Sequence, residues 1–261
     1  MIGIAIRKHA LSLLALVAAL AVQGRPAPAA ELSVLSGGAP QEVLAQLTPQ
    51  FEKQTGHKVK YSFALISALR QRLDAGEKAD LVLLPTAVID SYVDAGKMRA
   101  DGRSTLGSVG MTVIVKHGAS LPSISTPERF RQALLNARSI VHAPPGATPS
   151  GTHMAEVIEQ LGIADAIKNK VVYRAALNGG VDLVADGVAD IGIYPASEVA
   201  NIKGITLVGA LPGALQLSVV YGAAVTADNP APDVALSFVK FLADPANRQR
   251  WKKAGFEPPG G

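Results

Sequence analysis

Short apolar runs and amphipathic stretches alternate along most of the chain, and each pattern predicts one kind of element. The apolar runs, several of them alternating, predict strands. They lie at residues 32–36, 58–63, 80–84, 111–116, 139–143, 171–173, 189–194 and 217–225. Apolar positions at helical spacing predict helices at residues 42–55, 67–76, 89–96, 127–135, 150–161, 178–187, 232–242 and 244–254. Strand–helix–strand units with short connections predict an α/β fold of mixed, mostly parallel sheets flanked by helices.

The first 30 residues instead have the layout of a secretory signal peptide. Arg7 and Lys8 precede an apolar run at residues 10–22, and a stretch of small residues ends at Ala29 and Ala30. This run is shorter than the ~20 residues that a membrane-spanning helix needs, although an uncleaved anchor is the alternative. We expect cleavage after Ala29 or Ala30 and a periplasmic location.

Removal of this segment lowers the net charge of the chain. The chain has 25 Lys and Arg against 21 Asp and Glu, a formal charge of +4. Residues 1–30 hold Arg7, Lys8, Arg25 and no acidic residue, so the mature chain carries only +1. The remaining charges form no basic stripe, and we therefore expect no nucleic-acid partner.

Composition also excludes several kinds of site. The chain has no Cys, which excludes disulfides, thiolate zinc sites, cysteine nucleophiles and a lipid anchor behind the signal peptide. The five His show no metal-ligand spacing, and no motif of a common hydrolase or nucleotide-binding loop occurs. We expect no metal, no cofactor and no enzymatic activity. The one local nucleophile–base pair is Ser150 with His153, which leaves an exported hydrolase as an alternative.

Three turns after predicted strands are candidate ligand contacts, because α/β sheets bind ligands beyond the carboxyl ends of their strands. The first holds Gly37, Gly38 and Ala39, whose small side chains would let backbone N–H groups face an anion. An ordinary tight turn is the alternative. In the second turn, Ser67 can cap a helix or donate to a ligand, and Leu65 with Ile66 can wall an apolar pocket.

The third turn, residues 149–153, opens a helix with the sequence PSGTH. Ser150 or Thr152 can cap this helix or present a hydroxyl, and Gly151 would let a ligand approach the backbone. A plain N-cap is again the alternative, but the Pro- and Gly-rich loop before it is longer than a cap requires.

Several motifs resemble those of the periplasmic solute-binding proteins of ABC importers, and of their molybdate-binding branch in particular. They are V34-L35-S36-G37-G38-A39, F51-E52-K53-Q54-T55-G56, G76-E77-K78-A79-D80-L81-V82-L83, P149-S150-G151-T152 and A189-D190-I191-G192-I193-Y194. The likeness extends over most of residues 31–256 in order and spacing.

This resemblance implies a two-lobed type II periplasmic-binding-protein fold with a hinge between its lobes. Residues 31–112 with 216–261 would form the first lobe, and residues 113–215 the second. The implied function is capture of a small anion between the lobes for delivery to an inner-membrane ABC permease. The anion would be a molybdate- or tungstate-like oxyanion or a small organic carboxylate, and the protein a monomer. A ligand-sensing module with the same fold is the alternative.

Residue by residue, the resemblance transfers the ligand contacts to Ala39 in the first loop and to Leu65 and Ile66 in the second. The family's hydroxyl donors are missing at these positions. In the second lobe, the contacts fall on Ser150, on a backbone donor near Leu177-Asn178, and on Tyr194, or on Pro195 if no gap is allowed. The second lobe therefore retains anion donors, whereas the first has become more apolar.

Overall fold

The computed structural model describes residues 29–257 and 259. The predicted signal peptide, residues 1–30, lies outside this range except for Ala29 and Ala30. Within the described residues, no helix is both long enough and apolar enough to cross a bilayer.

A first sheet gathers strands from both ends of the chain. Its order is β2 (Lys58–Phe63), β1 (Glu31–Ser36), β3 (Leu81–Pro85), β9 (Ser218–Thr226) and β4 (Met98–Lys116). The pairs that β1 makes with β2 and β3 are parallel, as the strand–helix–strand pattern predicts. The pairs that β9 makes with β3 and β4 are antiparallel.

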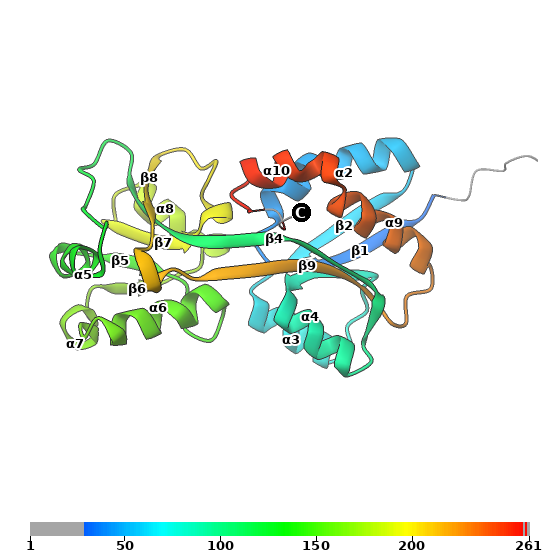
Figure 1. Cartoon of the computed structure of the whole chain (residues 1–261), viewed down its shortest axis with the longest axis horizontal. Coiled ribbons are helices and arrows are strands. Elements are labelled where there is room, and N and C mark those ends of the chain that lie inside the picture. The colour runs from blue at the N-terminus through cyan, green and yellow to red at the C-terminus, as the bar shows by residue number, and fades with distance from the viewer. Residues whose placement is uncertain (1–28, 258, 260–261) are drawn as a thin grey trace, which may run out of the picture. The chain divides into compact units, whose positions relative to one another are not determined.

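The end of β4 continues into a second sheet (Figure 1). There it pairs antiparallel with β7 (Ile191–Pro195) and β8 (Ile205–Ala210). Beyond β7 lie β5 (Ile140–His142) and β6 (Val171–Tyr173), which are parallel to their neighbours. The predicted class, a mixed α/β sheet with flanking helices, is confirmed, and the lobe boundaries stay a prediction.

Helices cover both faces of each sheet because their apolar stripes need a partner. Around the first sheet lie α2 (Gln41–Thr55), α3 (Ile66–Asp74), α4 (Thr86–Asp94), α9 (Pro232–Ala243) and α10 (Arg248–Lys253). Around the second lie α5 (Pro127–Asn136), α6 (Pro149–Gln160), α7 (Ala164–Ile167) and α8 (Gly180–Ala185). In Figure 1, α3 and α4 lie on the side of the first sheet opposite α2, α9 and α10. The buried residues accordingly form separate clusters on the two faces.

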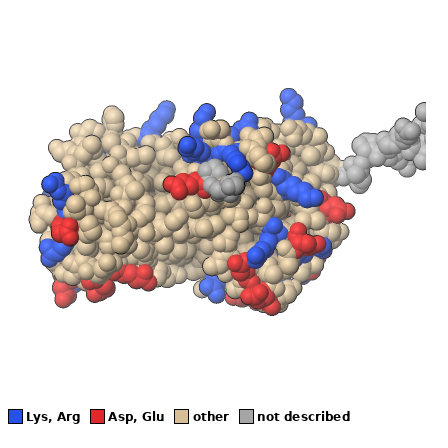
Figure 2. Space-filling model, in the orientation of Figure 1, with Lys and Arg blue, Asp and Glu red and all other residues tan. Residues whose placement is uncertain are grey.

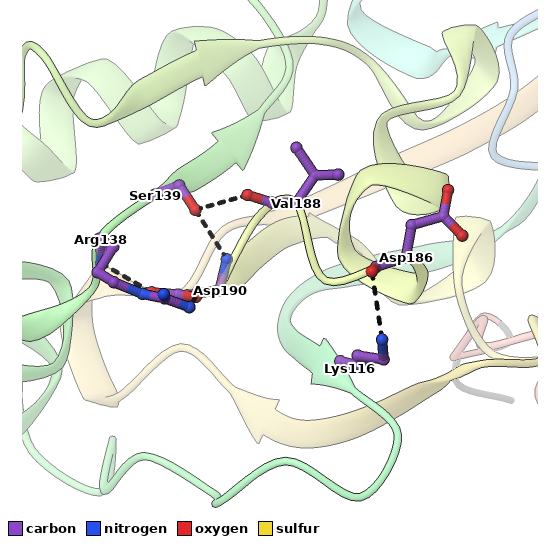
Figure 3. A network of polar contacts seen from close by, with 6 residues as sticks. All are labelled: Lys116, Arg138, Ser139, Asp186, Val188 and Asp190. Carbon is purple, nitrogen blue, oxygen red and sulfur yellow. Dashed lines mark hydrogen bonds and ion pairs between the residues drawn. The ribbon is translucent and has the colours of Figure 1, made fainter.

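In each sheet, an aspartate just before one strand accepts a hydrogen bond from the backbone at or near a neighbouring strand. Asp80, before β3, accepts from the backbone N–H of Ser33 at 2.7 Å. Asp190, before β7, accepts from the backbone N–H of Arg138 at 2.8 Å and from its guanidinium at 2.7 and 3.1 Å (Figure 3). These contacts join the starts of neighbouring strands, and they hold the pKa of the Asp190 carboxyl below its usual range.

Replacing Asp190 with alanine should lower the free energy of unfolding by about 1–2 kcal/mol. The variant loses hydrogen bonds from a backbone N–H and from the Arg138 guanidinium. The effect stays modest because the guanidinium is exposed, and solvent weakens exposed ion pairs. Because the folded-state pKa is lowered, this contribution is present above pH ~4 and is lost as the pH falls through the folded pKa. Urea unfolding at neutral and acidic pH measures it. Asp186→Ala, whose exposed carboxyl makes no hydrogen bond to a described residue, should change stability by less than ~0.5 kcal/mol. An equal loss in both variants would contradict this account.

Candidate functional site

A small cavity lies where the carboxyl ends of parallel strands from both sheets converge. Its volume is about 20 Å³, room for about one water molecule. The lining residues are Gly38, Ala64, Leu65, Ile66, Val109, Met111, Ala143, Thr148, Pro149, Ser150, Ala175, Leu177, Pro195, Glu198, Val219 and Tyr221. They follow or end β1, β2, β5, β6 and β7, or lie on β4 and β9 where these strands pass between the sheets. This is the position at which α/β sheets bind ligands.

The first turn of α6 forms one side of the cavity. Thr148 caps this helix, since its side-chain oxygen accepts from the N–H of Gly151 at 3.0 Å, and Pro149 occupies the first helical position. The prediction that Ser150 or Thr152 is the cap is therefore wrong. The Thr-Pro pair is the usual signal for a helix start and fixes the cap at Thr148, two residues before Ser150. The Ser150 Oγ lies 2.9 Å from the Thr148 Oγ1 and lines the cavity.

Three backbone donors at the cavity are free of partners within the described chain. The N–H groups of Gly38, Ile66 and Ser150 make no hydrogen bond to any described residue, and all three residues line the cavity. Two of them begin helices, whose first N–H groups have no partner inside the helix and suit an anion. Backbone donors from both sheets therefore surround this space.

The opposite wall is apolar. Leu65 and Ile66 line it, as the sequence predicts, together with Leu177 and Val219. Ile66 is buried, and a Cβ on Gly37 would lie 2.8 Å from its Cδ1, so these side chains fill the space tightly. A ligand with a carbon skeleton would find contacts here that a bare oxyanion would not use.

Glu198 is the one ionisable carboxyl among the described lining residues. It is partly buried at the end of the 3₁₀ turn Ala196–Glu198, directly after β7. It has no hydrogen bond or ion pair with any described residue, and burial raises the pKa of Glu198 to about 7. Tyr221, which is 5% exposed, also lines the cavity, and burial raises the pKa of its phenol.

Only some of the predicted contacts meet at this cavity: Gly38, Leu65, Ile66, Ser150, Leu177 and, as the alternative to Tyr194, Pro195. Ser67 and Thr152 line a neighbouring groove of about 610 Å³. There the N–H of Ser67 donates to the carbonyl of Ala147 at 3.2 Å, and this contact joins the loops of the two sheets.

The other predicted contacts lie outside the cavity lining. The Gly37 N–H donates to Leu83, and Ala39 is buried in the core beneath α2. Gly151 packs against the carbonyls of Ala143 and Pro144. Asn178 is exposed. Tyr194 is fully buried, and its hydroxyl donates to the carbonyl of Arg174 at 2.8 Å.

Ser150 and His153 do not form a nucleophile–base pair. One ring nitrogen of His153, Nε2, lies 2.8 Å from the Leu215 carbonyl, and the other lies 3.8 Å from Glu156. The Ser150 hydroxyl instead contacts Thr148. Within residues 29–257, no cluster of His, Asp and Glu could hold a metal ion.

A larger groove of about 750 Å³ lies beside the second sheet, but its basic side chains already have hydrogen-bond partners. Lys116 donates to the carbonyl of Asp186, and Arg138 pairs with Asp190 (Figure 3). Elsewhere, charges of both signs are dispersed over the face drawn in Figure 2, around a largely uncharged centre. The small cavity with its free donors is therefore the better candidate site.

Sequence reasoning missed Glu198, Tyr221 and Thr148 as parts of the site. Glu198 follows the predicted strand 189–194, so the rule that ligands bind beyond strand ends could have found it. Tyr221 lies inside a strand, and no sequence signal distinguishes it from a core residue.

Known proteins of similar sequence and structure bind or convert small solutes. A 28% identical relative, aconitate isomerase from Pseudomonas sp, matches over 239 residues, 88% of this chain and 89% of its own length. The molybdate-binding protein ModA of Escherichia coli is 25% identical and covers 87% of this chain and 88% of its own length. The Azotobacter vinelandii periplasmic molybdate-binding protein shares the fold with a TM-score of 0.74 at 21% identity, over 88% of this chain and all of that one. The model of the bacterial extracellular solute-binding protein family matches residues 32–257, and the chain therefore belongs to this family.

Proposed function

We propose that this solute-binding protein captures a small organic carboxylate in the cavity and delivers it to an ABC permease in the inner membrane. The observation that carries this proposal is the pairing of free backbone donors with an apolar wall at one site. Donors at Gly38, Ile66 and Ser150 suit a carboxylate, and the side chains of Leu65 and Ile66 suit a carbon skeleton.

A bare oxyanion fits the same site less well. Buried charge must be matched by several hydrogen bonds or it costs several kcal/mol. Ala39, Leu65 and Ile66 have no hydroxyl groups that could donate to such an ion. The relative named for aconitate, an organic carboxylate, supports a carboxylate ligand.

Entry of such a ligand requires the loops of the two sheets to separate, because the present cavity has room for about one water molecule. We assign this opening to the predicted hinge between lobe 31–112 with 216–261 and lobe 113–215. The Ser67–Ala147 hydrogen bond would break as the lobes part.

Calorimetric titration of the purified protein tests the ligand class. We expect binding of at least one of succinate, malate, tricarballylate and aconitate, and weaker or no binding of molybdate, tungstate, sulfate and phosphate. Ser150→Ala should weaken carboxylate binding about three- to tenfold, the effect of one hydrogen bond of about 1 kcal/mol. Ser67→Ala, outside the cavity, is the matched control. Tight binding of an oxyanion alone would contradict the proposal.

Loss of uptake in a deletion strain would separate a transporter from a sensor.

A second candidate function is isomerisation of an unsaturated carboxylate, which Glu198 and the aconitate isomerase relative favour. Ionised Glu198 would remove a proton from the carbon next to the double bond, and the C–H electron pair would form a new double bond. The electrons of the old double bond would then take the proton back from Glu198 at its far carbon, so that no co-reactant is consumed. Incubation with cis-aconitate in D₂O, followed by NMR, tests this candidate. Binding without deuterium incorporation or isomer formation would exclude it.

A further inference from the structure

The carboxyl of Glu198 lines the proposed anion site, where a negative charge would oppose the binding of an anion. Its Oε1 would lie 3.4 Å from a Cβ placed on Gly38, so it faces the turn after β1 across the cavity. No Lys, Arg or His pairs with it among the described residues. A carboxylate that stayed ionised beside a bound anion would repel it and weaken binding.

We propose that Glu198 binds the ligand as a neutral carboxylic acid, so that capture of a carboxylate takes up one proton. This inference rests on the proposed carboxylate ligand. The added proton removes the repulsion and turns an acceptor oxygen into an O–H donor directed at a ligand oxygen. Glu198 would thus select ligands that accept a hydrogen bond there.

The surroundings of Glu198 are consistent with a neutral form. The nearest titratable groups are the phenols of Tyr194 and Tyr221, whose pKa values are raised mainly by burial and further by the charge of Glu198. Glu42, on α2, shares a neighbouring groove with it but is hydrogen-bonded to Gln46 and Asn201. Arg174 is exposed, and its charge slightly offsets the rise in the pKa of Tyr194. None of these groups supplies a positive charge that would keep Glu198 ionised.

The direction of the pH dependence follows from the raised pKa of about 7. Below this pH, Glu198 is already protonated in the free protein, and affinity should not depend on pH. Above it, binding must draw a proton from solution, and the dissociation constant should rise up to tenfold per pH unit.

The test measures the dissociation constant between pH 6.5 and 9 for the tightest binder among succinate, malate, tricarballylate and aconitate. Titrations in buffers of different ionisation enthalpy also count the protons taken up. Wild-type protein should lose up to tenfold affinity per unit above pH ~7 and take up about one proton at pH 8. In Glu198→Gln the side chain is neutral at every pH. The dissociation constant of this variant should vary by no more than about twofold over the pH range, and binding should take up no proton.

The matched control is Glu42→Gln, which should keep the wild-type pH profile. A Glu198→Gln variant that also keeps that profile would overturn the inference, because the proton would then bind elsewhere. A wild-type profile that is flat above pH 7 would overturn it as well. If wild-type protein binds none of succinate, malate, tricarballylate and aconitate at any pH, the proposed function fails instead.

Discussion

Replacing Gly151 with alanine should destabilise the protein by about 3 kcal/mol or more and abolish ligand capture. A Cβ at this position would lie 2.2 Å from the carbonyl oxygen of Pro144 and 2.7 Å from that of Ala143. Both obstacles are backbone atoms, so relief of the clash must displace the start of α6 or the loop after β5. Either movement shifts the N–H and the hydroxyl of Ser150 away from the cavity.

Urea unfolding and carboxylate titration measure the two effects of Gly151→Ala. The matched control is Gly162→Ala, just after the same helix. Gly162 has a φ of +63°, but apart from its chain neighbours no described residue has an atom within 4 Å of its Cβ position. Only backbone strain of about 1–2 kcal/mol is therefore expected, with binding retained. Wild-type affinity in the Gly151 variant would show that the start of α6 does not position the ligand.

Trp251→Ala should lower the free energy of unfolding by about 3–5 kcal/mol. Trp251 is 2% exposed in the core of the first sheet, and its indole N–H donates to the carbonyl of Leu242 at 2.9 Å. Its ring also meets the Phe256 ring edge-on at a centroid distance of 5.0 Å. The substitution leaves a large cavity and an unpaired carbonyl beneath α10.

Chemical and thermal unfolding of three variants separate these contributions. Trp251→Phe retains much of the packing and loses the hydrogen bond, so it should cost clearly less than Trp251→Ala. Tyr173→Ala removes an aromatic ring that is 56% exposed and should cost less than either Trp251 variant. Equal stability losses for Trp251→Ala and Tyr173→Ala would contradict the assigned core.

The elements that the sequence predicts well are those with a local signal. The runs at 32–36, 80–84 and 189–194 are buried strands, and Thr126 caps a helix that begins at Pro127. The first part of β4, residues 98–110, was not predicted, because its Gly and polar residues have little strand preference. That segment is extended because it pairs with β9, a partner more than a hundred residues away.

The site was predictable as a set of loops but not as a set of side chains. The turns holding Gly38, Ile66 and Ser150 do converge on the cavity. Tyr194, expected there, instead donates its hydroxyl to a carbonyl behind the site. The role of Glu198 depends on its burial and on its lack of a cation, and neither property can be read from a single sequence.

The position of β9 also bears on the order in which the chain is made and exported. One edge of β3 is completed only by residues 221–225, near the end of the chain. During synthesis, β1, β2 and β3 must therefore wait for most of the remaining residues before their sheet can close. The first 30 residues predict export, and a chain that crosses a membrane unfolded would gain from this delay. Its early segment would stay open until β9 has been delivered, which would postpone folding to the far side of the membrane.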